Sequence, residues 1–282
     1  MKSNLVARHD LAHVLAPGLF RSLAPGGRAR KKLHVVWKVH GKRITFDGDE
    51  PLGVDDLRVL QALVALAGVG GNGRKKIAPA PKTDIGRKLR NDLMIAEASM
   101  DDDAIAEQTS WRELAATIGL KNHDNAGRRI AEVLDRLAKV SIVVEEGGRR
   151  QGFHLLAWCR ADSAVLGVWI ALNPLIARAI FGDGRYVHID MAEVRAIKKD
   201  TTRLLFQRLC GVIDFGKSRR FGLDTLSSYL WPDPPATPGA ERKRRQRIKA
   251  AMDELKSLNW GARFEAGNWL VTRPASKFGQ PS

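Results

Sequence analysis

One stretch of this chain, residues 109–158, limits what it can fold into more than any other. Ser110 and Glu113 stand at the spacing of a capping box, which predicts that the helix WRELAATI begins after Ser110 and stops at Gly119. After a short polar turn, a second helix is expected from Asn125. Its apolar residues recur at i, i+3, i+4 and i+7, the spacing of a buried stripe, as Ile130, Val133, Leu134 and Leu137.

Two strands are predicted after the second helix, at 140–146 and 152–158. They are joined by a turn that contains Gly147, Gly148, Arg149 and Arg150. This order of helix, turn, helix and basic hairpin is typical of a winged helix-turn-helix. We expect the strand at 165–172 to add to the same sheet and residues 173–181 to form a connecting helix.

The same order of elements returns near the end of the chain. Helices are predicted at 201–213 and 223–231, and a proline-rich link at 232–239 leads into a third helix at 240–258. Strands at 260–264 and 268–274 then flank a turn at Ala266 and Gly267. No residue-level similarity relates the two halves, so the repeat is one of architecture. We therefore expect an α+β fold of two tandem winged helix-turn-helix domains, at 1–180 and 181–282.

The first half carries additional elements before its helix-turn-helix. The β-rich runs at 33–39 and 42–48 predict a hairpin, and a helix with one apolar face is expected from Val54. Residues 69–107 form the least regular stretch, where we expect loops and short helices. A length of 282 residues agrees with about two domains.

The charge of the chain indicates the class of its partner. It has 47 Lys and Arg against 31 Asp and Glu, a net charge of +16. Residues 1–180 hold 28 basic and 20 acidic residues and residues 181–282 hold 19 and 11, so each part carries +8. Two basic domains indicate a polyanionic partner, while an arginine-rich composition typical of a GC-rich host is the alternative explanation.

Other features of the whole chain indicate the cellular compartment in which it works. No apolar run approaches the roughly 18 residues that a membrane span needs, and the N-terminus does not have a signal peptide's apolar core. Only Cys159 and Cys210 are present, which excludes a disulfide-rich secreted scaffold. We expect a protein of a reducing cytoplasm that does not contact a membrane.

The first helix-turn-helix and its hairpin offer candidate DNA contacts on the faces turned away from the apolar stripe. Early recognition-helix residues reach base edges in this motif, where Arg suits guanine and Asn suits adenine. Ordinary charge pairs on a solvated face, Arg128 with Glu132 and Asp135 with Lys139, are the alternative. The candidates are Asn125, Arg128, Arg129, Arg136, Lys139, Arg149 and Arg150.

The third helix of the second half is the stronger candidate, because six basic residues in ERKRRQRIK accompany one Glu. So much positive charge near a helix N-terminus opposes the helix dipole, and a phosphate backbone would compensate for it. The alternative, a disordered basic tail, conflicts with the apolar stripe Ile248, Ala251, Met252 and Leu255. The candidates here are Arg242, Lys243, Arg244, Arg245, Gln246, Arg247 and Lys249, with Arg263 in the second hairpin.

Several motifs fail their context tests for catalysis or cofactor binding. Residues 68–73 match G-x-G-x-x-G but follow a predicted helix, and Arg74 to Lys76 replace the Lys-Ser/Thr of a P-loop. His9 and His13 stand at i, i+4 without a third metal ligand. No nuclease or polymerase carboxylate cluster is visible. We therefore expect no cofactor, no metal site and no enzymatic activity.

Specific segments carry a resemblance to a known family. They are RHDLAHVLAPGLFRSL (8–23), PLGVDDLRVLQALVALAG (51–68), PKTDIGRKLR (81–90), KVSIVVEEGGRRQGFHLL (139–156), ALNPLIARAI (171–180), TTRLLFQRLCGVID (201–214), RKRRQRIKAAMDEL (242–255) and VTRP (271–274). The chain resembles the replication initiator C proteins (RepC) of IncQ-type plasmids, least closely at 91–107 and 232–240.

This resemblance implies a bacterial plasmid initiator that binds directly repeated iterons as duplex DNA and helps to open an adjacent AT-rich region. It also implies two winged-helix domains and a plasmid-encoded helicase and primase as partners, with homo-oligomerisation on the repeats left open. A transcriptional regulator with two winged helices is the alternative, and a relaxase or nuclease a more distant one. Origin-localised strand opening would separate the initiator from the regulator, and metal-dependent nicking would indicate the enzyme.

Overall fold

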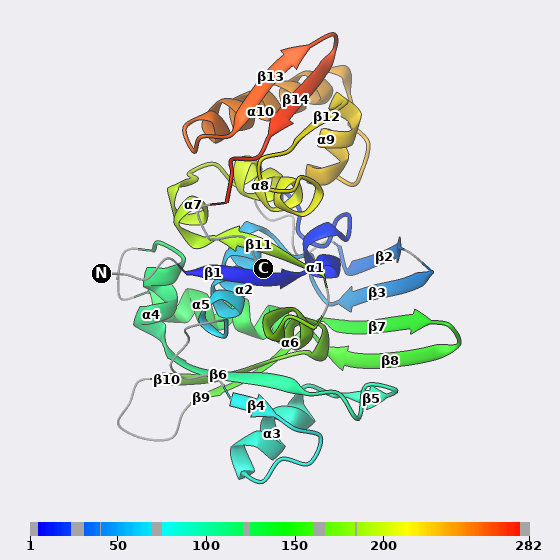
Figure 1. Ribbon diagram of the computed structural model, residues 1–282, viewed down its shortest axis with the longest axis vertical. Coiled ribbons are helices and arrows are strands. Elements are labelled where there is room, and N and C mark those ends of the chain that lie inside the picture. Colours follow the sequence, from blue (N-terminus) through cyan, green and yellow to red (C-terminus); the bar gives the residue numbers. More distant parts are fainter. Residues whose placement is uncertain are drawn as a thin grey trace.

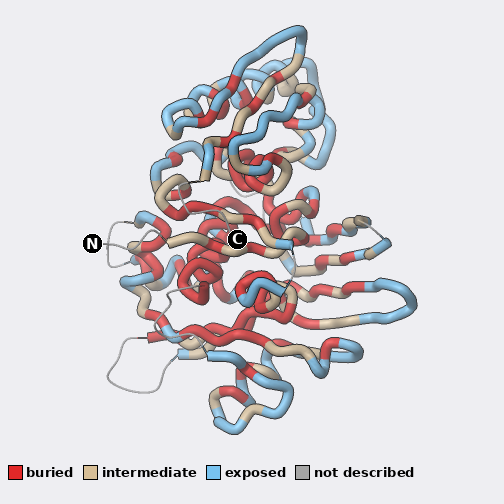
Figure 2. Tube along the Cα trace, in the orientation of Figure 1, coloured by how far each residue is buried: buried red, intermediate tan, exposed pale blue. Residues whose placement is uncertain are grey.

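The computed structural model describes residues 5–23, 31–39, 41–68, 75–120, 125–160, 167–183 and 185–276. In these residues, helices and antiparallel sheets surround a hydrophobic core that extends from the first strand to the last hairpin (Figure 1). Figure 2 shows buried residues along the middle of the molecule and exposed residues at the hairpin tips and at both ends of the long axis. The fold is a mixture of α and β structure.

The first predicted wing belongs to a wider sheet than the sequence indicated. The turn of this wing is confined to Gly147 and Gly148, because Arg149 and Arg150 already begin a strand. The lead-in hairpin at 33–39 and 42–48 is confirmed and lies beside the wing. In spatial order the sheet contains β2 (Leu33–Val39), β3 (Lys42–Gly48), β7 (Ser141–Glu146), β8 (Arg149–His154) and β5 (Ala96–Glu97).

A second sheet corrects two predictions. The run predicted as one strand at 152–158 is divided: its first part ends at His154 in the wing, and the residues from Leu156 on form a strand of the second sheet. The strand predicted at 165–172 does not join the wing: its described part pairs on both sides with strands of the second sheet. That sheet contains β4 (Lys75–Ile77), β6 (Ala104–Ser110), β10 (Gly167–Leu172) and β9 (Leu156–Arg160).

The stretch at 69–107 is more regular than expected. Residues 69–74 lie outside the described residues, and the remainder contains β4, β5, the start of β6 and the helix α3 (Asp84–Asp92). Leu89 and Leu93 pack with Ile77 and with small residues of β6, β9 and β10 in a separate small core. This core gives the second sheet a covered face, which explains why the stretch is not a set of loops.

Three helices of the first half that the sequence predicted lie where it placed them. They are α2 (Val54–Leu66), α4 (Trp111–Thr117) and α5 (Ala126–Ala138). Ser110 accepts a hydrogen bond from the amide of Glu113 at 3.1 Å, so the predicted cap of α4 is present. The predicted stripe of α5 is buried, and α5 packs against both α2 and α4. The turn at 121–124 between α4 and α5 lies outside the described residues.

The two halves share elements near the middle of the molecule. β1 (Val6–Asp10) pairs antiparallel with β11 (Tyr186–Asp190), across the predicted boundary between residues 180 and 181. Gln61 of α2 donates to Gln207 at 2.9 Å, and Gln207 donates to the His13 carbonyl at 3.2 Å. The division into two domains stays a prediction. The other elements here are α1 (Leu11–Leu15), α6 (Pro174–Phe181) and α7 (Met191–Ala196).

Besides β11 and α7, the second half has, from Asp200 on, the predicted elements and one additional strand. In chain order it contains α8 (Asp200–Val212), β12 (Ser218–Phe221), α9 (Leu223–Leu230), α10 (Pro238–Lys256), β13 (Gly261–Glu265) and β14 (Asn268–Thr272). α10 begins two residues before the prediction, because Thr237 caps it and Pro238 fits the first helical position. β12, which was not predicted, pairs with β14 on the side opposite to β13.

Candidate nucleic-acid interface

α10 exposes the largest group of predicted contact residues that are not engaged elsewhere. Its predicted stripe of Ile248, Ala251, Met252 and Leu255 is fully buried, so the opposite face of the helix is turned towards the solvent. Five candidates are exposed and make no ion pair or hydrogen bond with a residue that the structure describes. They are Arg242, Lys243, Gln246, Arg247 and Lys249. This face presents four cations and one amide to the solvent without compensating carboxylates.

Two other candidates of α10 hold the start of the helix. Arg244 donates to the carbonyls of Asp233 at 2.8 Å and Pro234 at 3.5 Å, and its guanidinium lies 5.1 Å from the ring centroid of Trp231. Arg245 forms an ion pair with Glu241 one turn earlier. Arg244 therefore fastens the proline-rich link to the helix, a role that its position in a basic run did not indicate.

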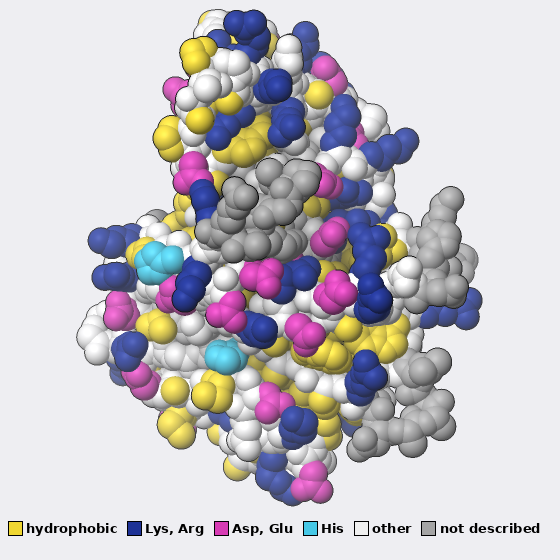
Figure 3. Space-filling view, turned by 180° about the vertical axis from the view of Figure 1, so that it is seen from behind, with side chains coloured by type: hydrophobic (Ala, Val, Ile, Leu, Met, Phe, Trp, Pro, Cys, Tyr) yellow, Lys and Arg dark blue, Asp and Glu magenta, His cyan; other side chains and the backbone are white. Residues whose placement is uncertain are grey.

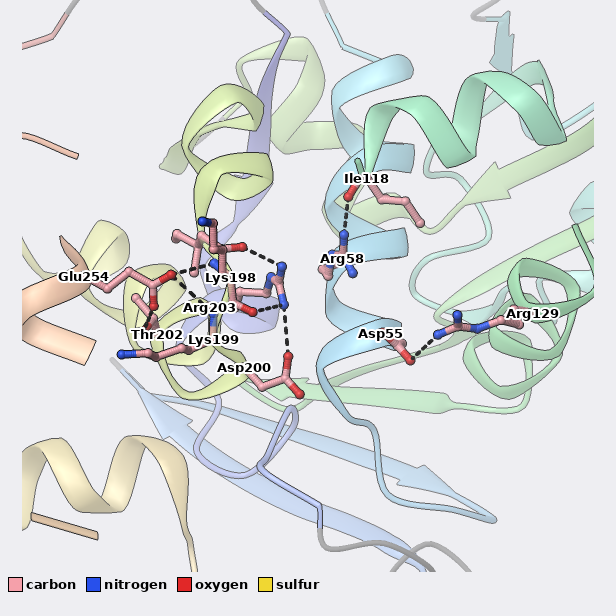
Figure 4. A network of polar contacts seen from close by, with 11 residues as sticks. Asp55, Arg58, Ile118, Arg129, Lys198, Lys199, Asp200, Thr202, Arg203 and Glu254 are labelled. Atoms are coloured by element: carbon pink, nitrogen blue, oxygen red, sulfur yellow. Dashed lines mark hydrogen bonds and ion pairs between the residues drawn. The ribbon is translucent and has the colours of Figure 1, made fainter. Parts of the chain in front are cut away.

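The other end of α10 is fixed by a carboxylate. Glu254 accepts from the amide of Lys198 at 2.6 Å and from the hydroxyl of the buried Thr202 at 2.7 Å, and more weakly from the amide of Lys199 at 3.3 Å (Figure 4). These groups surround the N-terminus of α8, where free amides and the helix dipole favour a negative charge. Glu254 thereby sets the position of α10 on α8.

The second hairpin follows α10 and carries two exposed side chains that are candidates for binding. Arg263 is exposed and only loosely paired, with its Nε 3.5 Å from a carboxylate oxygen of Glu265. Phe264 beside it is 59% exposed, and sequence reasoning missed it. The signal was an aromatic residue next to an arginine just before a hairpin turn.

The unpredicted strand β12 adds another cation to this sheet. Arg220 and Arg263 are both register partners of Leu270, so the three side chains share one face of the sheet. Arg220 is exposed and makes no ion pair with a described residue. It was missed because β12 itself was not predicted.

The candidates of α5 are mostly engaged with the protein itself. Arg136 donates from Nε to Oδ1 of the fully buried Asp56 at 2.9 Å, and its Nη2 forms an ion pair with the same oxygen at 2.9 Å. Arg129 lies 3.7 Å from Asp55, and Arg128 lies 3.5 Å from Glu132 as the alternative interpretation expected. These pairs leave the first candidate helix with little free positive charge.

The two remaining candidates of α5 are exposed. Asn125 lies at the N-cap position without a side-chain cap bond, and Lys139 lies at the C-terminal cap. The expected pair of Asp135 with Lys139 is replaced, because Asp135 accepts from the indole Nε1 of Trp158 at 3.2 Å. Lys139 thus makes no ion pair with a described residue.

Acidic side chains balance the first wing. Glu145 and Glu146 on β7 are the register partners of Arg150 and Arg149 on β8. Glu146 pairs with Lys42 at 2.8 Å, Glu145 lies 3.7 Å from Arg43, and Arg150 pairs with Glu97 at 3.1 Å. Exposed pairs of this kind contribute little to stability and exchange readily, but they leave the tip with little net charge.

The charge on the two parts of the surface differs accordingly. On the face drawn in Figure 3, Lys and Arg side chains predominate over the C-terminal part at the top. Across the middle of the same face, basic and acidic side chains alternate. The geometry therefore places the stronger attraction for a polyanion at α10 and its hairpin.

The described residues contain no group of three or more His, Cys, Asp and Glu that could hold a metal ion. His9 and His13 are buried, and Asp10 bonds to His13 and caps α1. Of the glycine-rich run at 68–73, only Gly68 lies in the described residues. None of the described helices is long and apolar enough to cross a bilayer.

Comparisons with known proteins identify relatives in sequence and in fold. The family model described as Replication protein C (RepC) matches residues 2–275. No curated protein matches the chain in sequence. A crystal structure of domains 2 and 3 of RctB has a TM-score of 0.58 at 11% identity, covering 95% of this chain and 99% of that chain. A second structure of RctB domains 2–3 has a TM-score of 0.50 at 14% identity, covering 93% and 95%. At these identities the likeness is one of fold alone.

Proposed function

This chain belongs to the Replication protein C (RepC) family, and we propose that it initiates plasmid replication by gripping repeated duplex sites with two winged-helix modules. Family membership makes the chain a replication initiator and favours that function over the transcriptional regulator. The finer statements, on the iterons, the modules and the partners, are our proposal.

The observation that carries the proposal is the free basic face of α10. The free cations of α10 lie on the exposed face of a helix whose opposite face is buried. No described acidic residue pairs with them, so they have no structural role inside the protein. In a winged helix, the helix before the wing enters the major groove. Arg242 and Gln246 on the outward face are suited to bidentate bonds with base edges, and Lys243, Arg247 and Lys249 to phosphates.

The first module plays a supporting role in this proposal. Asn125 and Lys139 at the two ends of α5 and Arg149 on the wing are its unpaired candidates. Its exposed ion pairs with Glu132, Asp55 and Glu97 would have to open before Arg128, Arg129 and Arg150 could contact phosphate. We infer that this module adds affinity and fixes the register, while α10 supplies most of the base contacts.

We propose that the origin is opened by binding energy, without nucleotide hydrolysis and without enzymatic activity. Several protomers on adjacent repeats would bend or wrap the DNA, and the strain would be relieved most easily in a flexible AT-rich tract. A plasmid helicase and primase in the bacterial cytoplasm would then act on the opened strands, as the resemblance to IncQ-type initiators implies.

The test is a competition between an iteron duplex and a scrambled duplex of the same composition, followed by probing of the origin. We expect the iteron duplex to bind more than about 1,000-fold more tightly, the lower end of typical specificity ratios. Single-stranded thymines should then appear in a negatively supercoiled origin plasmid with purified protein and no ATP. Equal affinity for both duplexes, or reactivity that requires hydrolysable ATP, would contradict the proposal.

A further inference from the structure

Phe264 is the most exposed Phe, Tyr or Trp side chain among the residues that the structure describes. It is 59% exposed, against 38% for Phe181, the next most exposed ring. It lies at the end of β13, just before the turn formed by Ala266 and Gly267. Isolated exposed apolar residues are common on protein surfaces, so its surroundings decide whether it has a function.

The ring of Phe264 is held in place on one side. Phe264 and Trp269 are register partners across the hairpin, and their ring centroids are 5.3 Å apart. Trp269 is almost completely buried, which anchors the pair to the core. Both turn residues have positive φ, +48° at Ala266 and +78° at Gly267, as in the tight turns that match the twist of a hairpin. Phe264 is therefore an apolar ring on a rigid support, with its outer part in solvent.

The hairpin that carries this ring packs against α10, the helix with the free cations. β13 follows α10 after a short turn and packs back along it (Figure 1). The five residues from Trp260 to Phe264 extend about 13 Å, as far as about nine residues of a helix. Phe264 shares its face of the sheet with the buried Trp269 and Phe221, whereas the exposed Arg263 and Arg220 lie on the opposite face of the same hairpin sheet.

The first wing has no corresponding feature. Its tip consists of Glu145, Glu146, two glycines and two arginines, and the charges are largely paired across the strands. The two hairpins therefore differ in chemistry: the first is polar and balanced, and the second presents an apolar ring in a basic setting.

We propose that Phe264 is a wedge that contacts the bases beside the site of α10 and unstacks a flexible base step. Apolar side chains inserted at base steps unstack and kink a duplex, and pyrimidine–purine steps deform most easily. The free cations of α10, together with Arg220 and Arg263 on the other face of the hairpin sheet, draw the phosphate backbone towards the hairpin, and the ring converts part of that attraction into distortion. This inference rests on the proposed function and assigns a residue to the coupling between binding and opening.

The test places 2-aminopurine at TA steps of an iteron duplex and measures its fluorescence at saturating protein, so that a change in affinity does not affect the result. The full chain is compared with Phe264→Ala, Phe264→Gln and Phe264→Leu, and Phe181→Ala is the control for removing an exposed ring. Gln retains an aliphatic cover over Trp269 without an apolar tip, so it remains informative if the Ala variant unfolds. Leu retains an apolar wedge.

We expect the Ala and Gln variants to lose most of the fluorescence increase, while their affinity for the linear duplex changes less than about fivefold because the phosphate contacts remain. Phe264→Leu and Phe181→Ala should keep the increase. A full increase with Ala and Gln would overturn the wedge, and so would specific binding by the wild-type chain without any increase. Normal opening combined with poor helicase loading would also overturn it, by indicating a protein contact. Failure of the wild-type chain to select the iteron would instead refute the proposed function.

Discussion

Arg136 of α5 donates a hydrogen bond of 2.9 Å from Nε to Oδ1 of Asp56, which lies fully buried at the start of α2, and its Nη2 forms an ion pair of 2.9 Å with the same oxygen. The other oxygen of Asp56 accepts from the amide of Gly53 at 2.7 Å. This arrangement ties the candidate recognition helix of the first half to the helix behind it. Arg136 was predicted as a DNA contact, and the structure shows it as a fastening between two helices.

Replacing Arg136 by Ala should therefore lower stability. Removal of one partner from a buried pair leaves an uncompensated charge, and we expect the free energy of unfolding to fall by about 3–5 kcal/mol. Urea denaturation measures this. The control is Arg128→Ala, whose side chain is exposed and pairs only with Glu132, and which should stay within about 1 kcal/mol of wild type. Weaker DNA binding by Arg136→Ala at unchanged stability would show that its role is contact after all.

The anchor of α10 provides a second stability prediction. Glu254→Gln retains the shape of the side chain but removes the charge that the N-terminal amides of α8 stabilise, and it should reduce the free energy of unfolding by about 1–3 kcal/mol. Asp253→Asn next to it is the matched control, because Asp253 is exposed and pairs only with Lys256. Thermal unfolding compares the two. Equal effects would mean that the bonds to α8 contribute nothing specific.

Arg242 and Gln246 should determine specificity. Substitution of either by Ala should relax discrimination at particular iteron positions, at about 1–3 kcal/mol for each lost bidentate contact. Arg149→Ala in the first wing should instead weaken binding evenly across sequences. Binding to a set of iterons mutated at one position at a time separates the two patterns, and identical profiles for α10 and the wing would refute this division.

Acid should destabilise the protein through His9. Burial has the largest effect on His9 and the neighbouring His13 the second largest, and together they lower the pKa of His9 from 6.5 to about 3. Below pH 6.5 the unfolded chain takes up a proton that the folded chain does not, so the free energy of unfolding falls as the pH decreases from about 6.5 towards 3. The slope from this group is up to about 1.4 kcal/mol per pH unit.

Urea denaturation between pH 7 and pH 4.5 tests this effect of His9. His9→Leu should flatten the dependence, whereas His34→Gln, which removes an exposed histidine, should keep it. Parallel curves for wild type and His9→Leu would assign the acid sensitivity to other groups.

The sequence predicted α8, α9, α10 and the last hairpin closely, because each has its own local signal. α10 combines a cap, a first-position proline and an apolar stripe, and the hairpin after it is marked by its turn. Its free basic face was predicted for the same reason, since the apolar stripe determines which residues point outward.

Features that depend on distant residues could not be predicted. Nothing local shows that the strand at 167–172 pairs with β6 instead of the wing, because that choice depends on which edges the folded chain brings together. Arg136 flanks the apolar stripe of α5 and was therefore counted among the candidate DNA contacts, but α2 places the buried Asp56 beside it. Similarly, the pairing of the first wing with Glu97 depends on the short strand β5, which has no sequence signal.

The central claim, that the free cations of α10 bind the DNA backbone, is tested most directly by the salt dependence of iteron binding. Wild type is compared with Lys243, Arg247 and Lys249 changed together to Ala, and with Lys42, Arg43 and Arg150 changed together as a control of equal charge. If the three α10 cations each neutralise a phosphate, the slope of log K against log[salt] should become shallower by about 2.7 in the first variant. The control should change it by less than about 1, because its cations are already paired on the protein. Equal slopes for the two variants, or an unchanged slope after loss of the α10 cations, would contradict the account.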